Sequence, residues 1–272
     1  MVVRNSVIAT TAETLLARRH DMAQSSTAVG FGKTTRRDAW WLELIPVVLV
    51  IGAFTVYASW RTFENSYYEF GPYLSPFYSP LIKPRWWPFS PAILILWAPL
   101  GFRATCYYYR KAVYRSFLLD PPGCAVGESH PHRYSGETKF PLILQNLHRY
   151  FLYVALIFLF ILWYDAISGF WFDSPAGKHF GIGVGSLVLV ANITLLSFYT
   201  LSCHSLRHIV GGKVDCFSCV AMGGTRHSVW RRLSILNEHH MLSAWLSLFS
   251  VGLADFYIRL VASGAIADLR LL

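Results

Sequence analysis

The chain has 272 residues, of which 54% are hydrophobic and only 14% are charged. Such an excess of apolar residues excludes an ordinary soluble domain. The formal net charge of +9 would suit a nucleic-acid-binding protein, but the basic residues are distributed as in a membrane protein, which argues against nucleic acid as a partner.

Five stretches are long and apolar enough to cross a bilayer, whose hydrocarbon core requires roughly 20 consecutive apolar residues per helix. They are residues 39–60, 91–109, 150–171, 181–203 and 241–262. None alternates in the way a barrel strand does, so we predict an all-α integral membrane protein, a five-transmembrane-helix bundle. The predicted organisation is an N-terminal segment, residues 1–38, followed by a membrane anchor domain, residues 39–272.

The basic residues predict the orientation of these helices. Seventeen lysines and arginines fall in segments that would share the side of the N-terminus, and six fall in segments on the other side. This asymmetry is the positive-inside pattern of membrane proteins. We therefore expect a multi-pass protein of the cell membrane with a cytoplasmic N-terminus.

Histidines and cysteines gather on the same predicted face. His148 stands at the cytoplasmic end of the third predicted helix and His240 opens the fifth. His204 and His208 lie at the cytoplasmic end of the fourth, where their i, i+4 spacing places them on one helix face. Thiols and imidazoles that lie at the same depth in the membrane are typical metal ligands. The candidate metal ligands are Cys106, Cys203, His204, His208, Cys216, Cys219 and His240. The alternative is that these histidines only face lipid headgroups.

The cysteines raise a second question, which is whether any of them forms a disulfide. All five lie at or near the predicted cytoplasmic face, where thiols stay reduced, so we expect no structural disulfide. Cys216 and Cys219 have the CxxC spacing of metal ligands. A single CxxC is also compatible with an ordinary reduced pair.

Arg103 is a charge inside the second predicted helix. Insertion at such a depth costs about 2.5–3.5 kcal/mol, so a partner or a functional use is expected. The partner could be a quinone carbonyl, a cofactor carboxylate or the carboxylate of Glu43. Near the other end of the fifth helix, Asp255 and Arg259 have i, i+4 spacing, which predicts a structural ion pair.

Four segments resemble one protein family. They are GFRATCYYYRK at 101–111, FPLILQNLHRYF at 140–151, SCHSLRH at 202–208, and residues 237–260. The chain from about residue 40 to 260 resembles the membrane-anchor, cytochrome b-like subunit of succinate dehydrogenase of high-GC Gram-positive bacteria. The resemblance implies a complex with a flavoprotein that oxidises succinate and an iron–sulfur subunit that relays electrons. It also implies that the anchor passes those electrons to membrane quinone and carries no catalytic residue for succinate oxidation; a small extra membrane subunit is an open alternative.

Two redox centres are compatible with this resemblance. Anchors of this class often hold two stacked haems, but the outer face offers only His179, so a two-haem arrangement is not expected. One haem b could still use two of His148, His204, His208 and His240. A Rieske-type [2Fe–2S] cluster, with two thiolates on one iron and two imidazoles on the other, is slightly favoured because a haem leaves the thiols unexplained. Its usual CxH and CxxH spacing is absent.

Quinone binding is expected near the same face. The residues predicted to bind menaquinone or ubiquinone, or to supply its protons, are His148, Arg103, Arg149 and Tyr107. A metal-ion transporter or sensor is a rival hypothesis from another class, but transporters place their ligands near the bilayer midplane. An anchor with an empty histidine–cysteine cluster is a third alternative.

Overall fold

The computed structural model describes residues 30–128, 137–140, 142–175 and 177–272. His130, His132 and most of the predicted N-terminal segment lie outside the described residues. The chain divides into two compact units. The first comprises residues 1–51 and 110–135, and the second comprises residues 52–109 and 136–272.

In the first unit, two segments that are distant in sequence are held together by short polar contacts. Thr34 and Val126 form an isolated antiparallel bridge. Arg36 Nη1 donates to the carbonyl of Cys124 at 3.2 Å, and Arg115 Nη2 lies 3.1 Å from Glu43 Oε2. The Glu43 carboxylate, one of the expected partners of Arg103, is therefore paired with Arg115 instead.

Among the described residues, four segments are long and apolar enough to cross a membrane. They are Trp40–Glu64, which joins the 3-10 helix η1 (Trp40–Glu43) to α2 (Leu44–Glu64); Leu142–Ser168, which joins η2 (Leu142–Leu147) to α6 (His148–Ser168); α7 (Val184–Leu201); and α10 (His240–Ala262). The predicted all-α membrane architecture is confirmed. The count of five such helices is not confirmed.

The stretch at 91–109 differs from prediction because it forms three short helices, α3 (Pro91–Ile95), α4 (Trp97–Ala104) and α5 (Tyr107–Phe117). Pro99 has no N–H to donate to the carbonyl of Ile95, and the first break falls directly after Ile95. At the second break the Thr105 side chain donates to the carbonyl of Gly101 at 2.6 Å. Such back-bonding competes with the helical ladder.

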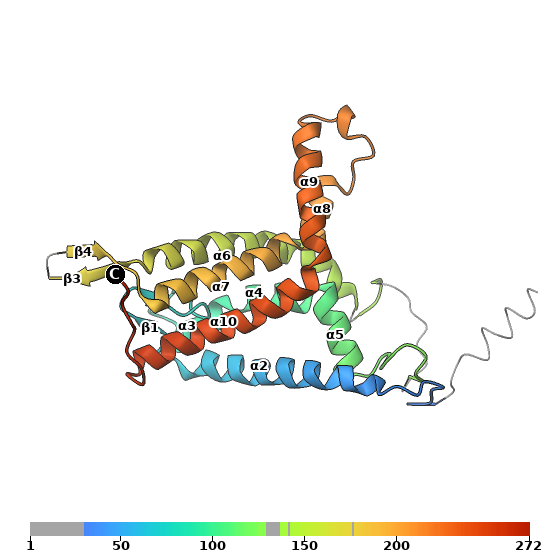
Figure 1. The fold of residues 1–272 in the computed structure, drawn as a ribbon, viewed down its shortest axis with the longest axis horizontal. Coiled ribbons are helices and arrows are strands. Elements are labelled where there is room, and N and C mark those ends of the chain that lie inside the picture. Colours follow the sequence, from blue (N-terminus) through green and yellow to red (C-terminus); the bar gives the residue numbers. More distant parts are fainter. Residues whose placement is uncertain (1–29, 129–136, 141, 176) are drawn as a thin grey trace, which may run out of the picture. The chain divides into compact units, whose positions relative to one another are not determined.

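In the second unit, α7 packs against α10 and α6, and α6 also packs against α4 (Figure 1). Two antiparallel hairpins lie at one end of this bundle: β1 (Glu69–Phe70) with β2 (Tyr73–Leu74), and β3 (Trp171–Ser174) with β4 (Gly177–Phe180). Tyr73 is buried there against α7, where a Cβ on Gly185 would lie 2.5 Å from its ring. Only glycine permits this close approach.

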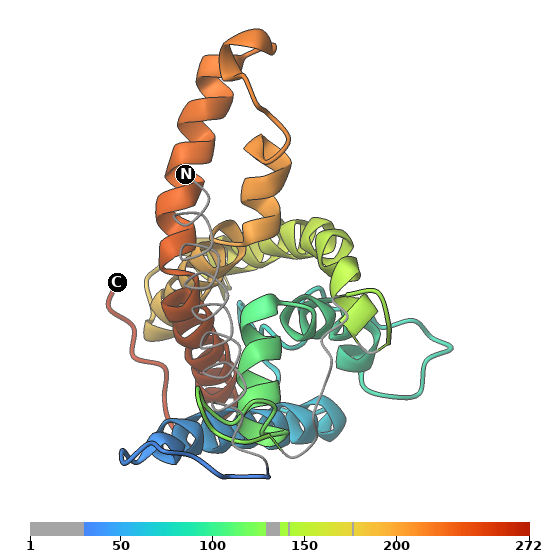
Figure 2. The same ribbon diagram turned by 90° about the vertical axis from the view of Figure 1, so that its right-hand side faces the viewer.

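At the opposite end of the bundle, α8 (His204–Gly211) and α9 (Gly223–Glu238) protrude as a pair joined through η3 (Phe217–Cys219), as Figures 1 and 2 show. The pair is held by aromatic contacts, with the Arg207 guanidinium 4.9 Å from the Trp230 ring. In the connecting loop, Cys216 and Cys219 form a disulfide. The expectation that all five thiols are reduced is therefore wrong for this pair, because the tight η3 turn brings the two side chains together.

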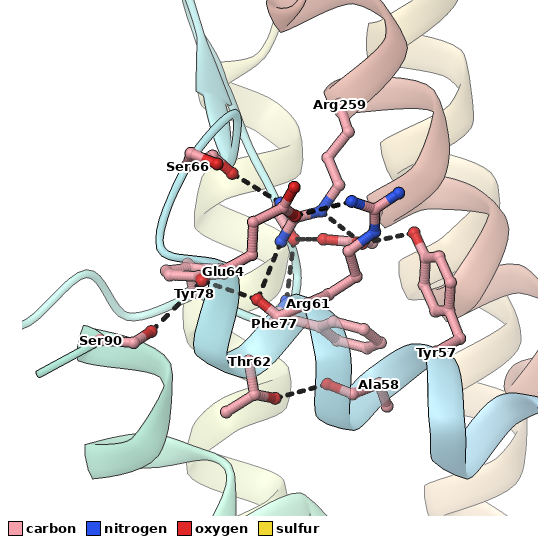
Figure 3. A network of polar contacts seen from close by, with 12 residues as sticks. Tyr57, Ala58, Arg61, Thr62, Glu64, Ser66, Phe77, Tyr78, Ser90 and Arg259 are labelled. Carbon is pink, nitrogen blue, oxygen red and sulfur yellow. Dashed lines mark hydrogen bonds and ion pairs between the residues drawn. The ribbon is translucent and has the colours of Figure 1, made fainter.

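The predicted Asp255–Arg259 ion pair is confirmed and is part of a larger buried network (Figure 3). Arg259 Nε lies 2.8 Å from Asp255 Oδ2, and its Nη1 lies 2.9 Å from Glu64 Oε2. The Asp255 carboxylate, which is fully buried, also accepts from Tyr57 Oη at 2.6 Å and from Ser75 Oγ. The network joins α2 and α10 to the chain on either side of the β1–β2 hairpin, at Ser66 and Ser75.

Candidate functional site

Two cysteine–histidine pairs lie together where helices of the second unit begin or end. Cys106 Sγ is 3.3 Å from His240 Nε2, and Cys203 Sγ is 3.1 Å from His148 Nε2. The two cysteines occupy breaks in the chain, between α4 and α5 and between α7 and α8, while each histidine is the first residue of a long helix. Both cysteines are buried, at 2% and 1% exposure.

Each imidazole also contacts a hydroxyl group through its other ring nitrogen. His148 Nδ1 is 2.9 Å from Thr105 Oγ1, and His240 Nδ1 is 2.7 Å from Ser202 Oγ. Thr105 directly precedes Cys106 and Ser202 directly precedes Cys203. Each histidine is therefore held by both chain breaks, by the hydroxyl of one and the thiol of the other. This crossed pattern makes the two pairs a single site, here called the Cys–His site.

Aromatic rings also connect the two halves of the Cys–His site. The Phe102 ring stacks on His148 at 4.8 Å, and the Tyr199 ring stacks on His240 at 5.2 Å. Phe102 and Tyr199 contact each other at 5.5 Å. Both rings are buried. They form apolar walls of the site and stack on both imidazole planes.

Arg103 lies beside this site and is partnered within the bundle. Its guanidinium donates to Tyr109 Oη at 2.5 Å and to Ser247 Oγ at 3.0 Å, and its Cζ lies 4.7 Å from the centre of the Tyr199 ring. These contacts are made by hydroxyls, a backbone carbonyl and an aromatic ring, and they leave the positive charge without a carboxylate partner. A formal charge so placed favours electron density in the Cys–His site.

The break between α7 and α8 is fixed by a contact from a distant part of the chain. At the end of α7, Ser202 is helical but Cys203 is extended, with φ −62° and ψ 133°. The carbonyl of Ser202, which has no helical partner, accepts from Asn237 Nδ2 at 2.7 Å. Because the helix restarts at His204, the Cys203 side chain is directed to His148 rather than along α8.

The other predicted ligands lie outside the Cys–His site. His204 is exposed at the start of α8, and its pKa is lowered by partial burial and by the neighbouring charges of Arg207 and His208. His208 Nδ1 is 3.2 Å from an Arg149 guanidinium nitrogen. Cys216 and Cys219 are bonded to each other at the far end of the α8–α9 pair.

The predicted quinone-binding residues lie in three places, Arg103 being the one beside the Cys–His site. His148 and Arg149 line a pocket of about 270 Å³, whereas Tyr107 is exposed at the first position of α5. The remaining lining residues of this pocket are Gln145, Asn146, Tyr150 and Ser205. Within the described part of the chain, Gln145 Oε1 is buried without a hydrogen-bond partner.

Several residues of the site were not predicted. Thr105, Ser202, Phe102 and Tyr199 contact the histidines, yet none was among the predicted ligands. The one sequence signal that could have found two of them is the repeated hydroxyl–cysteine dipeptide, Thr105-Cys106 and Ser202-Cys203. Across the described ranges, no three His, Cys, Asp or Glu side chains are grouped so that they could hold one metal ion.

Comparison with known proteins identifies the family. The family described as "Actinobacterial succinate dehydrogenase subunit SdhC" matches residues 42–264. A chain of the structure "Mycobacterium smegmatis Sdh1 complex in the apo form" is 44% identical, with a TM-score of 0.77 over 88% of this chain and 94% of that chain. No curated protein matches the chain. The matched region contains the whole Cys–His site, and the chain belongs to the actinobacterial succinate dehydrogenase SdhC family.

Proposed function

We propose that this chain is the membrane anchor that passes electrons from the iron–sulfur subunit of succinate dehydrogenase to membrane quinone through a [2Fe–2S] centre held at the Cys–His site. The crossed contacts of Cys106, His148, Cys203 and His240 carry this proposal. The positive-inside pattern supports a cytoplasmic N-terminus and places the site on the face where the flavoprotein and iron–sulfur subunits would dock.

The donor set fits the cluster. A Rieske-type centre takes two thiolates on one iron and two imidazoles on the other, so its four donors would come from both pairs of the Cys–His site, with two donors per iron rather than three or four around one ion. Histidines that bind metals usually contact a second partner through the other ring nitrogen, as His148 and His240 do with Thr105 and Ser202. When bound, such a cluster supplies one-electron transfer at a potential raised by its histidines.

The residues of this chain would hold and tune the centre. The buried thiols and the stacked rings of Phe102 and Tyr199 exclude water, and the Arg103 charge favours the reduced state. The residues also revise the expected ligand set, because His148 replaces His204 and His208 beside Cys203. A single haem on two of these histidines would leave both cysteines without a role, so the observed pairs favour the cluster.

The pocket beside His148 is the proposed quinone headgroup site. The pocket is close to the roughly 300 Å³ lower bound of known ligand sites. Arg149 could donate to a quinone carbonyl, and the unpartnered Gln145 Oε1 could accept from a quinol hydroxyl. His148 lines this pocket and belongs to the Cys–His site, so a quinone bound there would lie next to the source of its electrons.

The test compares matched histidine variants of the purified complex. His240→Gln is expected to lose two irons and two acid-labile sulfides per complex, and to lose succinate–quinone activity while retaining succinate oxidation with a soluble artificial acceptor. His204→Gln is the control and is expected to retain all three properties, because His204 lies outside the Cys–His site. Full iron content in His240→Gln would refute the proposed ligand set.

Two further measurements separate the alternatives. Sharp α-bands in the visible spectrum of the reduced complex would indicate haem instead of a cluster. Iron no greater than that of the soluble subunits would refute both centres. For the quinone site, Arg149→Gln is expected to raise the KM for quinone with little change in iron content, and an unchanged KM would contradict the assignment of the pocket.

A further inference from the structure

One buried hydroxyl of the Cys–His site is not accounted for by its contacts. Tyr199 is 1% exposed, and its Oη has no hydrogen-bond partner among the described residues. A buried hydroxyl left unsatisfied costs about 1–3 kcal/mol. Buried polar groups in native structures nearly always have a partner, so an exception at a candidate site requires an explanation.

The neighbouring polar groups are all partnered, which sets this hydroxyl apart. Thr105 and Ser202 contact the imidazoles, and both ring nitrogens of His148 and His240 are in contact. The hydroxyl of Tyr109, another buried tyrosine nearby, donates to the carbonyl of Ala244 at 2.7 Å. Among the described polar side chains of the site, the Tyr199 hydroxyl is therefore the donor that lacks an acceptor.

The position of Tyr199 limits what its hydroxyl can serve. Its ring stacks on His240 and lies 4.7 Å from Arg103 Cζ, and the Cys106 thiol, a weak acceptor, lies beside the phenol. Arg103 is a cation and offers no acceptor. The acceptor is expected on the side of Cys106 and His240, where the first thiol of the proposed cluster would lie.

We infer that Tyr199 is a positioning residue whose hydroxyl donates a hydrogen bond to a sulfur of the centre held by Cys106 and His240. This inference rests on the proposed function. A hydrogen bond to a cluster sulfur stabilises the reduced state, which carries one more negative charge, and so raises the reduction potential. The hydroxyl therefore makes the centre a better acceptor of electrons from the iron–sulfur subunit.

The test is a redox titration of the membrane-embedded complex, followed by electron paramagnetic resonance. Tyr199→Phe removes only the hydroxyl and is expected to lower the midpoint potential of the cluster without loss of iron or sulfide. Tyr78→Phe is the matched control, because Tyr78 is equally buried but donates to the carbonyl of Arg61 in the Arg259 network. Its potential is expected to equal that of the wild type.

A second variant keeps the inference testable if Tyr199→Phe does not assemble. Incorporation of 3-fluorotyrosine at position 199 retains the hydroxyl and makes it a stronger donor, so the midpoint potential is expected to rise. An unchanged potential in both variants would overturn the inference, as would a raised KM for quinone without any shift in potential. A wild-type complex without a membrane-embedded cluster signal would instead refute the proposed function itself.

Discussion

Asp255→Ala tests whether the buried network at the hairpin end of the bundle stabilises this anchor. The substitution removes the acceptor of Arg259, Tyr57 and Ser75 at once. Breaking a buried ion pair by removing one partner typically costs 3–5 kcal/mol. Arg259 would retain Glu64 at 2.9 Å, which reduces the cost, but two hydroxyls would lose their acceptor. We expect a loss of about 3–4 kcal/mol in the free energy of unfolding.

The assay follows tryptophan fluorescence of the purified chain in mixed micelles as the fraction of SDS increases. Asp255→Asn retains an acceptor oxygen in the same shape and is expected to cost less than the alanine variant. Lys83→Met provides an exposed comparison, since Lys83 and Glu69 are 3.7 Å apart and about half exposed; it should cost at most about 1 kcal/mol. Equal losses in Asp255→Ala and Lys83→Met would refute the reasoning.

Two further predictions concern helix packing and the ligand set. Gly185→Ala places a Cβ 2.5 Å from the ring of the buried Tyr73 and should lower the free energy of unfolding by about 1–3 kcal/mol. Gly252→Ala is the control, because a Cβ there meets nothing closer than 3.7 Å. The thermal midpoints of the two variants should therefore differ, and equal midpoints would contradict the close approach. The double variant Cys216→Ser, Cys219→Ser should retain the iron and sulfide of the wild-type complex, because the disulfide is remote from the Cys–His site. Loss of the cluster in this variant would show that the loop cysteines are ligands.

The sequence by itself determined most of the membrane architecture. Apolar length identified four segments that the structure also shows as long helices, because a spanning helix must satisfy its backbone internally and present an apolar surface. The i, i+4 spacing of Asp255 and Arg259 was enough to predict their ion pair. The stretch at 91–109 was different, since apolar composition does not reveal that Pro99 and Thr105 interrupt the helix.

The composition of the candidate site was also partly readable from the sequence. Cys106, Cys203 and His240 were identified as ligand types at one face, and the structure brings them together. Periodicity then favoured His204 and His208, because the fourth helix was assumed to continue through Cys203. Nothing in the local sequence pairs Cys203 with His148, which lies 55 residues away.

Only the tertiary structure decided which histidines belong to the site. The end of α7 depends on Asn237, which lies 35 residues away in the sequence. The side-chain amide of Asn237 donates a hydrogen bond to the carbonyl of Ser202. That long-range bond allows Cys203 to leave the helix and contact His148, while His204 and His208 point elsewhere on α8. Helical spacing reports which residues share a face of one helix; it carries no information about contacts made across helices, and those contacts define the Cys–His site.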